Sequence, residues 1–208
     1  MGSKIIIIGG GGHALVLIDS LHSAGEHIYG ITENNTEIND IEGIPVLGTD
    51  ETIMAMASDS IKLINGLGMI NLDGRRKQIY SCFRERGYEF CRVIHPTAII
   101  SPKAELGSGV QVMAGAVIQT HAQIGSNTIV NTRAVVEHDV SIGSHCHIAT
   151  GAVICGGVRV GDGTLVGAGA TIKQGIKIGS GCLVAAGAMV TDDIMSNTRV
   201  KGVPAFKF

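Results

Sequence analysis

A short run of ionisable residues, Glu137, His138 and Asp139, has the composition of a general-base site. A carboxylate beside an imidazole can accept the Nδ1 proton in a hydrogen bond, which leaves Nε2 free to take a proton from a substrate. Glu137 and Asp139 are both candidates for that carboxylate. A solvated polar corner with no catalytic role is the competing interpretation, because exposed turns collect polar residues.

A run of four glycines, Gly9 to Gly12, is the second feature with a chemical use. It follows an apolar stretch at 4–8 and precedes an expected helix, so its backbone N–H groups can approach a phosphate closely. Gly9, Gly11 and Ala14 satisfy G-x-G-x-x-A, and Glu33 stands near the position of the acidic residue in dinucleotide folds. Only about four strands are expected here, which favours a mononucleotide or nucleotide-sugar over NAD. A tight turn without any ligand is the alternative.

The ionisable run lies inside a six-residue repeat that extends from Ile94 to Val190. Every sixth residue is a large aliphatic, and a second register four residues later is small or β-branched. Six is neither a helix nor a strand period, so the repeat predicts a parallel β-helix with three sides and eighteen residues per coil. Glycine marks the coil length by recurring every eighteen residues, at Gly107, Gly125, Gly143, Gly161 and Gly179.

The coil length also predicts which residues lie above one another. Gly156 falls directly above His138, where it leaves a gap over the imidazole, and His121 falls beneath Asp139. His147 is half a coil away from His138, so the two can meet only across an interface between two three-sided β-helices (prisms). Three histidines meeting there would offer a metal site, but the carboxylate beside His138 favours a base, and we expect no metal.

The chain before residue 93 follows a different pattern, in which strands alternate with helices. Strands are expected at 4–8, 27–33, 62–65 and 90–94, and helices at 13–24, 49–57 and 73–86. The first helix has Leu15, Ile18 and Leu21 on its expected apolar face, and Thr49 or Asp50 caps the second. This alternation predicts a small parallel α/β sheet of Rossmann type. We expect a Rossmann-like nucleotide-sugar-binding domain at 1–92 and the β-helix domain at 93–208, with a tail after Val190.

Composition argues against several classes of partner. The 16 basic and 18 acidic residues give a formal charge of −2, so nucleic acid is not an expected partner. No stretch reaches the roughly 18 apolar residues of a membrane span, and no basic, cleavable leader opens the chain, so we expect a cytoplasmic protein. The five cysteines form no CxxC pair, and Cys146 and Cys182 fall in the small interior register, so we expect them to be reduced and structural.

Several segments together resemble a known family across nearly the whole chain. They are GGGGH after the first strand, IHP at the domain junction, NT and EHD in the coil, HIATGAV, and GVPA near the end. The sequence resembles the left-handed β-helix sugar acetyltransferases with an N-terminal Rossmann-like domain. This group includes bacillosamine-pathway and perosamine N-acetyltransferases and sialic-acid O-acetyltransferases. The left hand of the helix is implied by this resemblance alone.

The resemblance implies a homotrimer that acetylates the amino group of a nucleotide-linked amino-deoxysugar, with acetyl-CoA in the groove between coils, for bacterial surface glycan synthesis. It implies His138 as the base, Asp139 as the carboxylate that raises its basicity, and Asn131 near the reacting groups. The cofactor contacts that it implies are His147, Ala168 and Ala186. The nucleotide-sugar contacts that it implies are Gly11, Gly12, His13, Glu33, Asn34 and Gly68.

Two departures from the family leave the substrate open. The family often has two aspartates after the second strand, where this chain has Glu33 and Asn34. The loop at 65–68 also differs from that of a uridine-sugar enzyme, so a GDP-sugar or a CMP-related acid sugar remains open beside a UDP-sugar. O-acetylation of a sialic-type sugar is the alternative activity, and a non-catalytic nucleotide-sugar-binding scaffold is the alternative outside enzymes.

Overall fold

A computed structural model describes residues 4–35 and 37–208 of the chain. Its internal contacts define two compact units, Met1–Gly68 with Arg75–Pro96, and Met69–Gly74 with Thr97–Phe208. Within the described residues, no helix is both long enough and apolar enough to cross a bilayer.

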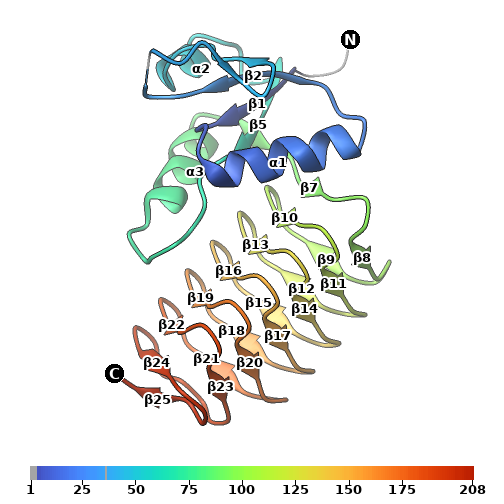
Figure 1. Cartoon of the computed structure of the whole chain (residues 1–208), viewed down its shortest axis with the longest axis vertical. Helices are drawn as coiled ribbons and strands as arrows, with labels where there is room; N and C mark the ends of the chain where they lie inside the picture. Colours follow the sequence, from blue (N-terminus) through green and yellow to red (C-terminus); the bar gives the residue numbers. More distant parts are fainter. Residues whose placement is uncertain (1–3, 36) are drawn as a thin grey trace. The chain divides into compact units, whose positions relative to one another are not determined.

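The first unit is built on a parallel sheet with the order β2-β1-β5-β6 (Figure 1). Its strands in the described part of the chain are β1 (Lys4–Ile8), β2 (Ile28–Thr32), β5 (Ile61–Asn65) and β6 (Glu89–Phe90). Ile6, Ile7 and Ile8 are at most 1% exposed, because helices and loops cover both faces of a parallel sheet. The expected four-stranded parallel sheet is therefore confirmed.

The helices of this unit are α1 (Gly12–Ser23), α2 (Glu51–Met54) and α3 (Arg75–Glu85). The expected apolar face of α1 was wrong at Leu15, which is 41% exposed. The buried positions are Ala14, Leu17, Ile18 and Leu21, which follow the i, i+3, i+4, i+7 spacing of one helix face. Leu15, Ile18 and Leu21 are spaced three residues apart, whereas an α-helix has 3.6 residues per turn, so Leu15 lies outside the buried face.

Other boundaries in the first unit also differ from expectation. α2 is a single turn without a side-chain cap, because the Asp50 carboxylate instead accepts a hydrogen bond from Thr32 Oγ1 at 2.6 Å. The expected strand at 90–94 is interrupted, and its second part is β7 (Val93–Ile94). A short hairpin of β3 (Asp40–Ile41) and β4 (Ile44–Pro45) was not expected. The Ile41 side chain of this hairpin packs against Gly10.

The second unit is a parallel β-helix whose coils each contribute short strands to three faces (Figure 1). One face carries β10 (Gln111–Val112), β13 (Ile129–Val130), β16 (His147–Ile148), β19 (Leu165–Val166), β22 (Leu183–Val184) and β24 (Arg199–Lys201). The second carries β8 (Ile99–Ile100), β11 (Val117–Ile118), β14 (Val135–Val136), β17 (Val153–Ile154), β20 (Thr171–Ile172) and β23 (Met189–Val190). The third carries β9 (Glu105–Leu106), β12 (Gln123–Ile124), β15 (Ser141–Ile142), β18 (Arg159–Val160) and β21 (Lys177–Ile178).

The interior of the β-helix follows the two registers of the repeat. From Val112 to Val190 the large aliphatics are at most 4% exposed, and they pair coil to coil at a separation of eighteen residues. Burial of each such side chain contributes roughly 1.5–3 kcal/mol. Cys146 and Cys182 occupy the small register at 0% exposure, as expected.

The glycines that recur every eighteen residues line one corner of the β-helix. A Cβ atom at any of them would lie within 2.6 Å of an atom in the next coil. At Gly125, for example, it would lie 2.4 Å from the backbone carbon of Gly143. The close approach of consecutive coils at this corner therefore requires residues without a side chain.

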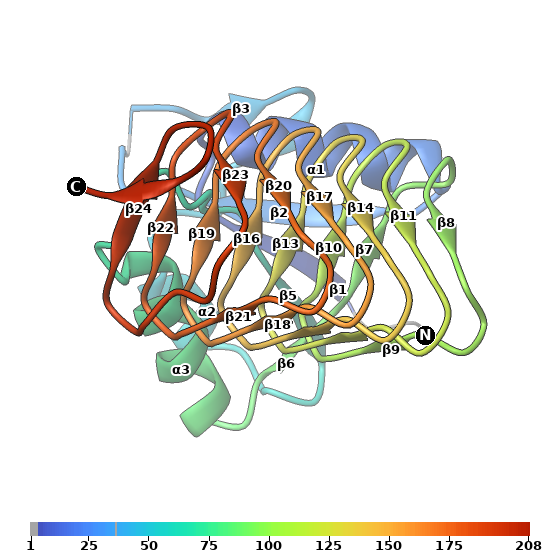
Figure 2. The same ribbon diagram turned by 90° about the horizontal axis from the view of Figure 1, so that it is seen from below.

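The C-terminal segment is not the simple tail that we expected after Val190. Ile194 forms a bridge with Ile178, and β24 pairs with β22 so that Leu183 lies beside Arg199. The separation from 183 to 199 is sixteen residues, so the helix continues through one coil that is two residues shorter. The chain then folds back as β25 (Phe206–Lys207), antiparallel to β24 (Figure 2).

Candidate active site

His138 and Asp139 lie in the turn between β14 and β15, at an outer corner of the β-helix. His138 Nδ1 is 2.8 Å from Asp139 Oδ2, and the side chains are 52% and 60% exposed. Because a carboxylate only accepts, Nδ1 carries the proton, and in the neutral imidazole Nε2 keeps its lone pair. Asp139, and not Glu137, is thus the carboxylate hydrogen-bonded to His138 in this structure.

Gly156 lies directly over the imidazole of His138, as the eighteen-residue coil predicted. A Cβ at position 156 would lie 2.7 Å from Nε2 and 2.8 Å from Cε1 of His138. The next residue, Gly157, donates its N–H to the His138 carbonyl at 2.9 Å, which ties the two coils together. The ring therefore rests in space that any other residue at 156 would fill.

His121 lies on the preceding coil beneath Asp139, also as predicted. Its Nδ1 is 3.7 Å from Asp139 Oδ1, while Asp139 Oδ2 is bonded to His138. The two oxygens of one carboxylate therefore face two imidazoles from successive coils.

Asn131 and His147 form a second polar cluster, with 3.1 Å between Asn131 Nδ2 and His147 Nε2. Asn131 Oδ1 accepts the Thr132 N–H at 2.7 Å, which fixes the orientation of the amide. His147 Nδ1 lies 2.7 Å from the Met69 carbonyl, so Nδ1 carries a proton and Nε2 accepts the amide N–H. Both ring nitrogens of His147 are therefore used within the chain.

Ala168 and Ala186 lie at the same corner of the β-helix as Asn131, in the turns that follow β19 and β22. Both are exposed, and the Ala168 carbonyl accepts the Gly187 N–H at 2.8 Å. Built Cβ atoms at the neighbouring Gly169 and Gly187 would meet nothing within 4 Å. This part of the corner is thus open and poor in side chains, which lets an extended ligand reach the backbone.

Within one chain the two clusters do not come together. Asn131 begins the turn before β14, whereas His138 and Asp139 lie in the turn after it. His147 is on β16, which belongs to a different face of the β-helix from β14. A site that uses both clusters therefore requires a neighbouring chain.

The glycine loop of the first unit divides into two pairs with different surroundings. Gly9 has φ +85°, a backbone conformation that favours glycine. A Cβ at Gly10 would lie 2.2 Å from Ile41 Cδ1, so packing favours glycine there. Gly11 is the N-cap of α1 and Gly12 is its first residue, and a Cβ at either position would meet nothing within 4 Å. Neither φ angle is positive, so neither backbone conformation nor packing requires glycine at these two positions.

The remaining predicted residues of the first unit gather around this loop. Glu33 follows β2, accepts the Gly10 N–H through Oε2 at 2.7 Å, and accepts the Asn34 N–H through Oε1 at 2.7 Å. Gly68 follows β5, and a Cβ there would lie 3.3 Å from His13 Cβ. The structure therefore brings together the segments after β1, β2 and β5, at the carboxyl end of the sheet where α/β folds bind ligands.

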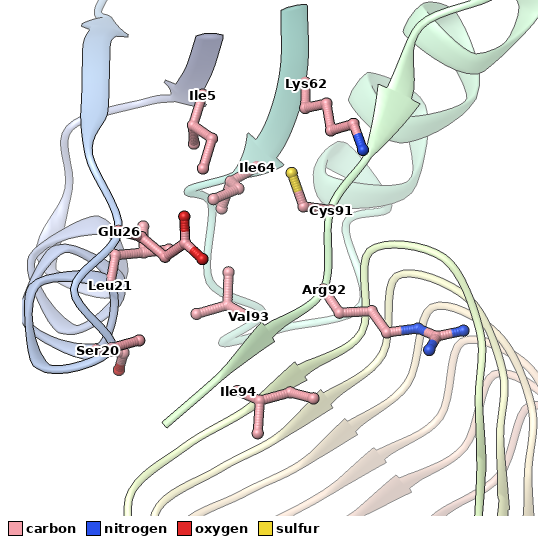
Figure 3. A pocket seen from close by; sticks show the side chains of 11 residues that line it. Ile5, Ser20, Leu21, Glu26, Lys62, Ile64, Cys91, Arg92, Val93 and Ile94 are labelled. Atoms are coloured by element: carbon pink, nitrogen blue, oxygen red, sulfur yellow. The ribbon is translucent and has the colours of Figure 1, made fainter. Parts of the chain in front are cut away.

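A cavity of the first unit lies away from this loop. It measures about 420 Å³ and is lined by α1, by Ile5, Lys62 and Ile64 of the sheet, and by residues 91–94 (Figure 3). None of its lining residues belongs to the predicted site. Burial raises the pKa of the Cys91 thiol in its wall, so this thiol is protonated and unreactive at neutral pH.

Sequence reasoning missed two features of these sites. The contact between His147 and the Met69 carbonyl joins residues 78 positions apart, and no spacing rule relates them. His145, which no expectation singled out, is half-buried, with its Nδ1 3.0 Å from Asn127 Nδ2. The eighteen-residue separation of Asn127 and His145 was the available signal.

Among the residues described, no group of three or more His, Cys, Asp or Glu side chains has the geometry of a metal site.

Family comparisons agree with this two-part architecture. Residues 4–82 match the family described as PglD N-terminal domain. Residues 121–156 match bacterial transferase hexapeptide (six repeats), and residues 157–192 match the hexapeptide repeat of succinyl-transferase. No curated protein matches the sequence.

Solved structures are similar over the entire chain. A histidine-to-asparagine mutant of perosamine N-acetyltransferase from Caulobacter crescentus, in complex with CoA and GDP-perosamine, is 35% identical with a TM-score of 0.92. The match covers 100% of this chain and 98% of that one. The acetyltransferase domain of PglB from Neisseria gonorrhoeae FA1090 is 31% identical with a TM-score of 0.91, and covers 100% of both chains. The chain therefore belongs to the hexapeptide-repeat N-acetyltransferases that carry a PglD-type N-terminal domain, and it is an acyltransferase.

Proposed function

We propose that this protein transfers the acetyl group of acetyl-CoA to the amino group of a nucleotide-linked amino-deoxysugar, either a UDP- or a GDP-sugar. The observation that carries the proposal is the 2.8 Å contact between His138 Nδ1 and Asp139 Oδ2, which leaves Nε2 available at an exposed corner. The Caulobacter relative with CoA and GDP-perosamine and the Neisseria domain with acetyl coenzyme A support this choice of substrates. The reaction belongs, in this proposal, to bacterial surface glycan synthesis in the cytoplasm.

His138 is the general base of the proposed reaction. Nε2 takes a proton from the sugar amine while the amine nitrogen bonds to the acetyl carbon. The carbon–sulfur bond then breaks, and the imidazolium gives its proton to the departing sulfur, so that CoA leaves as the thiol and His138 is neutral again. Asp139 holds the imidazole in the tautomer with the proton on Nδ1 and stabilises the cation that forms. Such a base is typically worth about 10²–10⁴ in rate.

The nucleotide-sugar is held, in this proposal, by the domain at 1–92 through Gly11, Gly12, His13, Glu33, Asn34 and Gly68. Gly11 and Gly12 support a phosphate site, because they leave the N-terminus of α1 open where the fold does not demand glycine. The Glu33 carboxylate already accepts hydrogen bonds from the Gly10 and Asn34 N–H groups. Its contribution to nucleotide-sugar binding is therefore to fix the conformation of these two loops. Asn34, which is exposed, is the candidate for direct contact with the nucleotide.

Acetyl-CoA is proposed to bind along the β-helix domain at 93–208, in a groove between neighbouring subunits. The open corner at Ala168 and Ala186 supports this, because an extended thioester chain can approach its backbone. Since both nitrogens of His147 are bonded within the chain, its contact with the cofactor would come from the ring carbons. Asn131, bonded to His147, completes the edge of that groove.

We further propose a homotrimer with its active sites between subunits. The supporting observation is that His138 and the cluster of Asn131 and His147 lie at different corners of one chain. Packing of identical prisms around a three-fold axis brings such corners together. Neighbouring chains then supply the base and the cofactor contacts to one site.

A substrate panel tests the function. The protein is incubated with acetyl-CoA and UDP-, GDP- or CMP-linked amino sugars, and each product is identified by mass spectrometry while thiol release is followed. Acetylation at nitrogen with a UDP- or GDP-sugar is the expected result. Transfer to a hydroxyl of an acid sugar would replace the proposal by O-acetylation, and tight sugar binding without thiol release would favour a scaffold.

A further inference from the structure

The corners of the β-helix carry an unusual run of side chains. Over the fully described range 109–187, every sixth residue has a positive φ angle. Glycine fills most of these left-handed positions, as expected, since other residues are disfavoured there. Five consecutive positions nevertheless carry side chains, namely His121, Asn127, Arg133, Asp139 and His145.

These side chains are placed at a conformational cost of roughly 1 kcal/mol each, which is smaller for Asn and Asp. Residues eighteen apart share a corner, so the run forms stacked pairs. Asn127 and His145 make a hydrogen bond of 3.0 Å at one corner. His121 and Asp139 face each other at another, with 3.7 Å between Nδ1 and Oδ1.

We propose that His121 is a positioning residue that holds the Asp139 carboxylate in place for the base. This inference rests on the proposed role of His138. Asp139 turns Oδ2 to His138 at 2.8 Å and Oδ1 to His121 at 3.7 Å, so a single rotation of its carboxylate would disturb both contacts. Among the described residues, the hydrogen bonds and ion pairs link His121 to Asp139 and Asp139 to His138, so His121 acts on the base through Asp139.

The separation of 3.7 Å exceeds a direct hydrogen bond and falls within ion-pair range. Contacts of this kind are often long in a ligand-free site and shorten when substrate binds. The His121 and Asp139 side chains are 58% and 60% exposed, so the contact with water weakens their interaction. The expected effect of His121 on turnover is therefore small, about two- to fivefold.

The left-handed backbone at His121 allows a clean pair of test variants. His121→Gly removes the ring while suiting φ +60°. His121→Asn also tolerates this conformation, and its Nδ2 takes the place of the imidazole Nδ1. His145→Gly is the matched control, because it removes a ring from φ +59° at a different corner.

Two readouts are measured on the full-length protein. The first is kcat and KM for both substrates, and the second is the NMR signal of the His138 Nδ1 proton in protein with ¹⁵N-labelled histidine. We expect His121→Gly to lower kcat about two- to fivefold without changing either KM, and to broaden the Nδ1 proton signal by faster exchange with water. His121→Asn should restore both, and His145→Gly should leave both unchanged.

An unchanged kcat and an unchanged Nδ1 signal in His121→Gly would overturn the inference. So would a loss that His121→Asn does not restore, since the side chain would then act by some route other than a donor to Asp139. The NMR readout does not require turnover. If no sugar is acetylated but the Nδ1 signal responds as described, the proposed function fails while the His121 contact stands.

Discussion

The His138 imidazole lies against Gly156, one coil further along the β-helix, in the space that a side chain at 156 would occupy. A Cβ there would be 2.7 Å from Nε2, the atom proposed to take the proton. The position of the candidate base therefore depends on a glycine eighteen residues later, which has no reactive group itself but leaves room for the imidazole.

Gly156→Ala should displace the imidazole of His138 without unfolding the protein. The φ angle of Gly156 is not positive, so the backbone accepts alanine, and the flexible ring moves instead. We expect kcat to fall by at least about tenfold, since misplacement of a base by about 1 Å costs that much or more. Steady-state kinetics and thermal unfolding of Gly156→Ala check this, with Cys155→Ala as the neighbouring control. Wild-type kcat in Gly156→Ala would contradict the role of Nε2.

The base variant itself gives the largest expected effect. His138→Ala should lower kcat by at least about 10², while the affinity for CoA stays near that of the wild type. The affinity is measured by calorimetry and kcat by thiol release. His22→Ala is a suitable control, because His22 is exposed at the end of α1 in the other unit. A His138→Ala protein that keeps most of its turnover would refute the proposed mechanism.

Mixed assemblies test the shared site. If neighbouring chains supply His138 and His147, then His138→Ala and His147→Ala chains that are each inactive should recover part of the activity after co-refolding. Some interfaces in such hybrids contain both intact residues. Sedimentation of the wild type should show a trimer, and a fully active monomer would exclude this arrangement.

Two substitutions in the glycine loop should affect ligand binding and folding stability separately. Gly12→Ala meets open space at a φ that is not positive, so it should leave the melting temperature unchanged and raise KM for the nucleotide-sugar. Gly9→Ala is strained at φ +85° and meets Leu67 Cδ1 at 2.8 Å, so it should cost about 1–2 kcal/mol of stability. Thermal unfolding and substrate titration distinguish the two. A Gly12→Ala protein with unchanged KM would remove the phosphate site from this loop.

At alkaline pH the buried Cys146 thiol should make the free energy of unfolding depend on pH. Burial raises its pKa from the ordinary 9.0 to about 12, so the unfolded chain ionises first. The stability that this thiol contributes is complete below pH 9 and is lost as pH rises towards 12, by at most ~1.4 kcal/mol per pH unit. Burial lowers the pKa of Arg76 to about 9, which acts with the opposite sign in the same range. The difference between the wild type and Cys146→Ala in urea unfolding, measured below and above pH 9, isolates the thiol. Parallel stability curves for the two proteins would contradict this assignment.

The sequence by itself determined the β-helix and its coil-to-coil neighbours. A coil of eighteen residues repeats without insertion from Ile94 to Val190, so simple addition places Gly156 over His138 and His121 under Asp139. The parallel sheet was equally predictable, because a buried central strand such as β1 is an unbroken apolar run. Regular backbone geometry turns sequence separation into distance in both cases.

Only the tertiary structure decided the contacts that no period relates. The choice of Asp139 over Glu137 depends on side-chain direction at a left-handed turn, with φ +59° at Asp139. The bond from His147 to the Met69 carbonyl depends on where a loop from outside the repeat settles. The short last coil, with Arg199 beside Leu183, depends on strand pairing that continues after the six-residue pattern has ended. These contacts depend on side-chain direction or on packing between segments that the repeat does not relate, and local patterns encode neither.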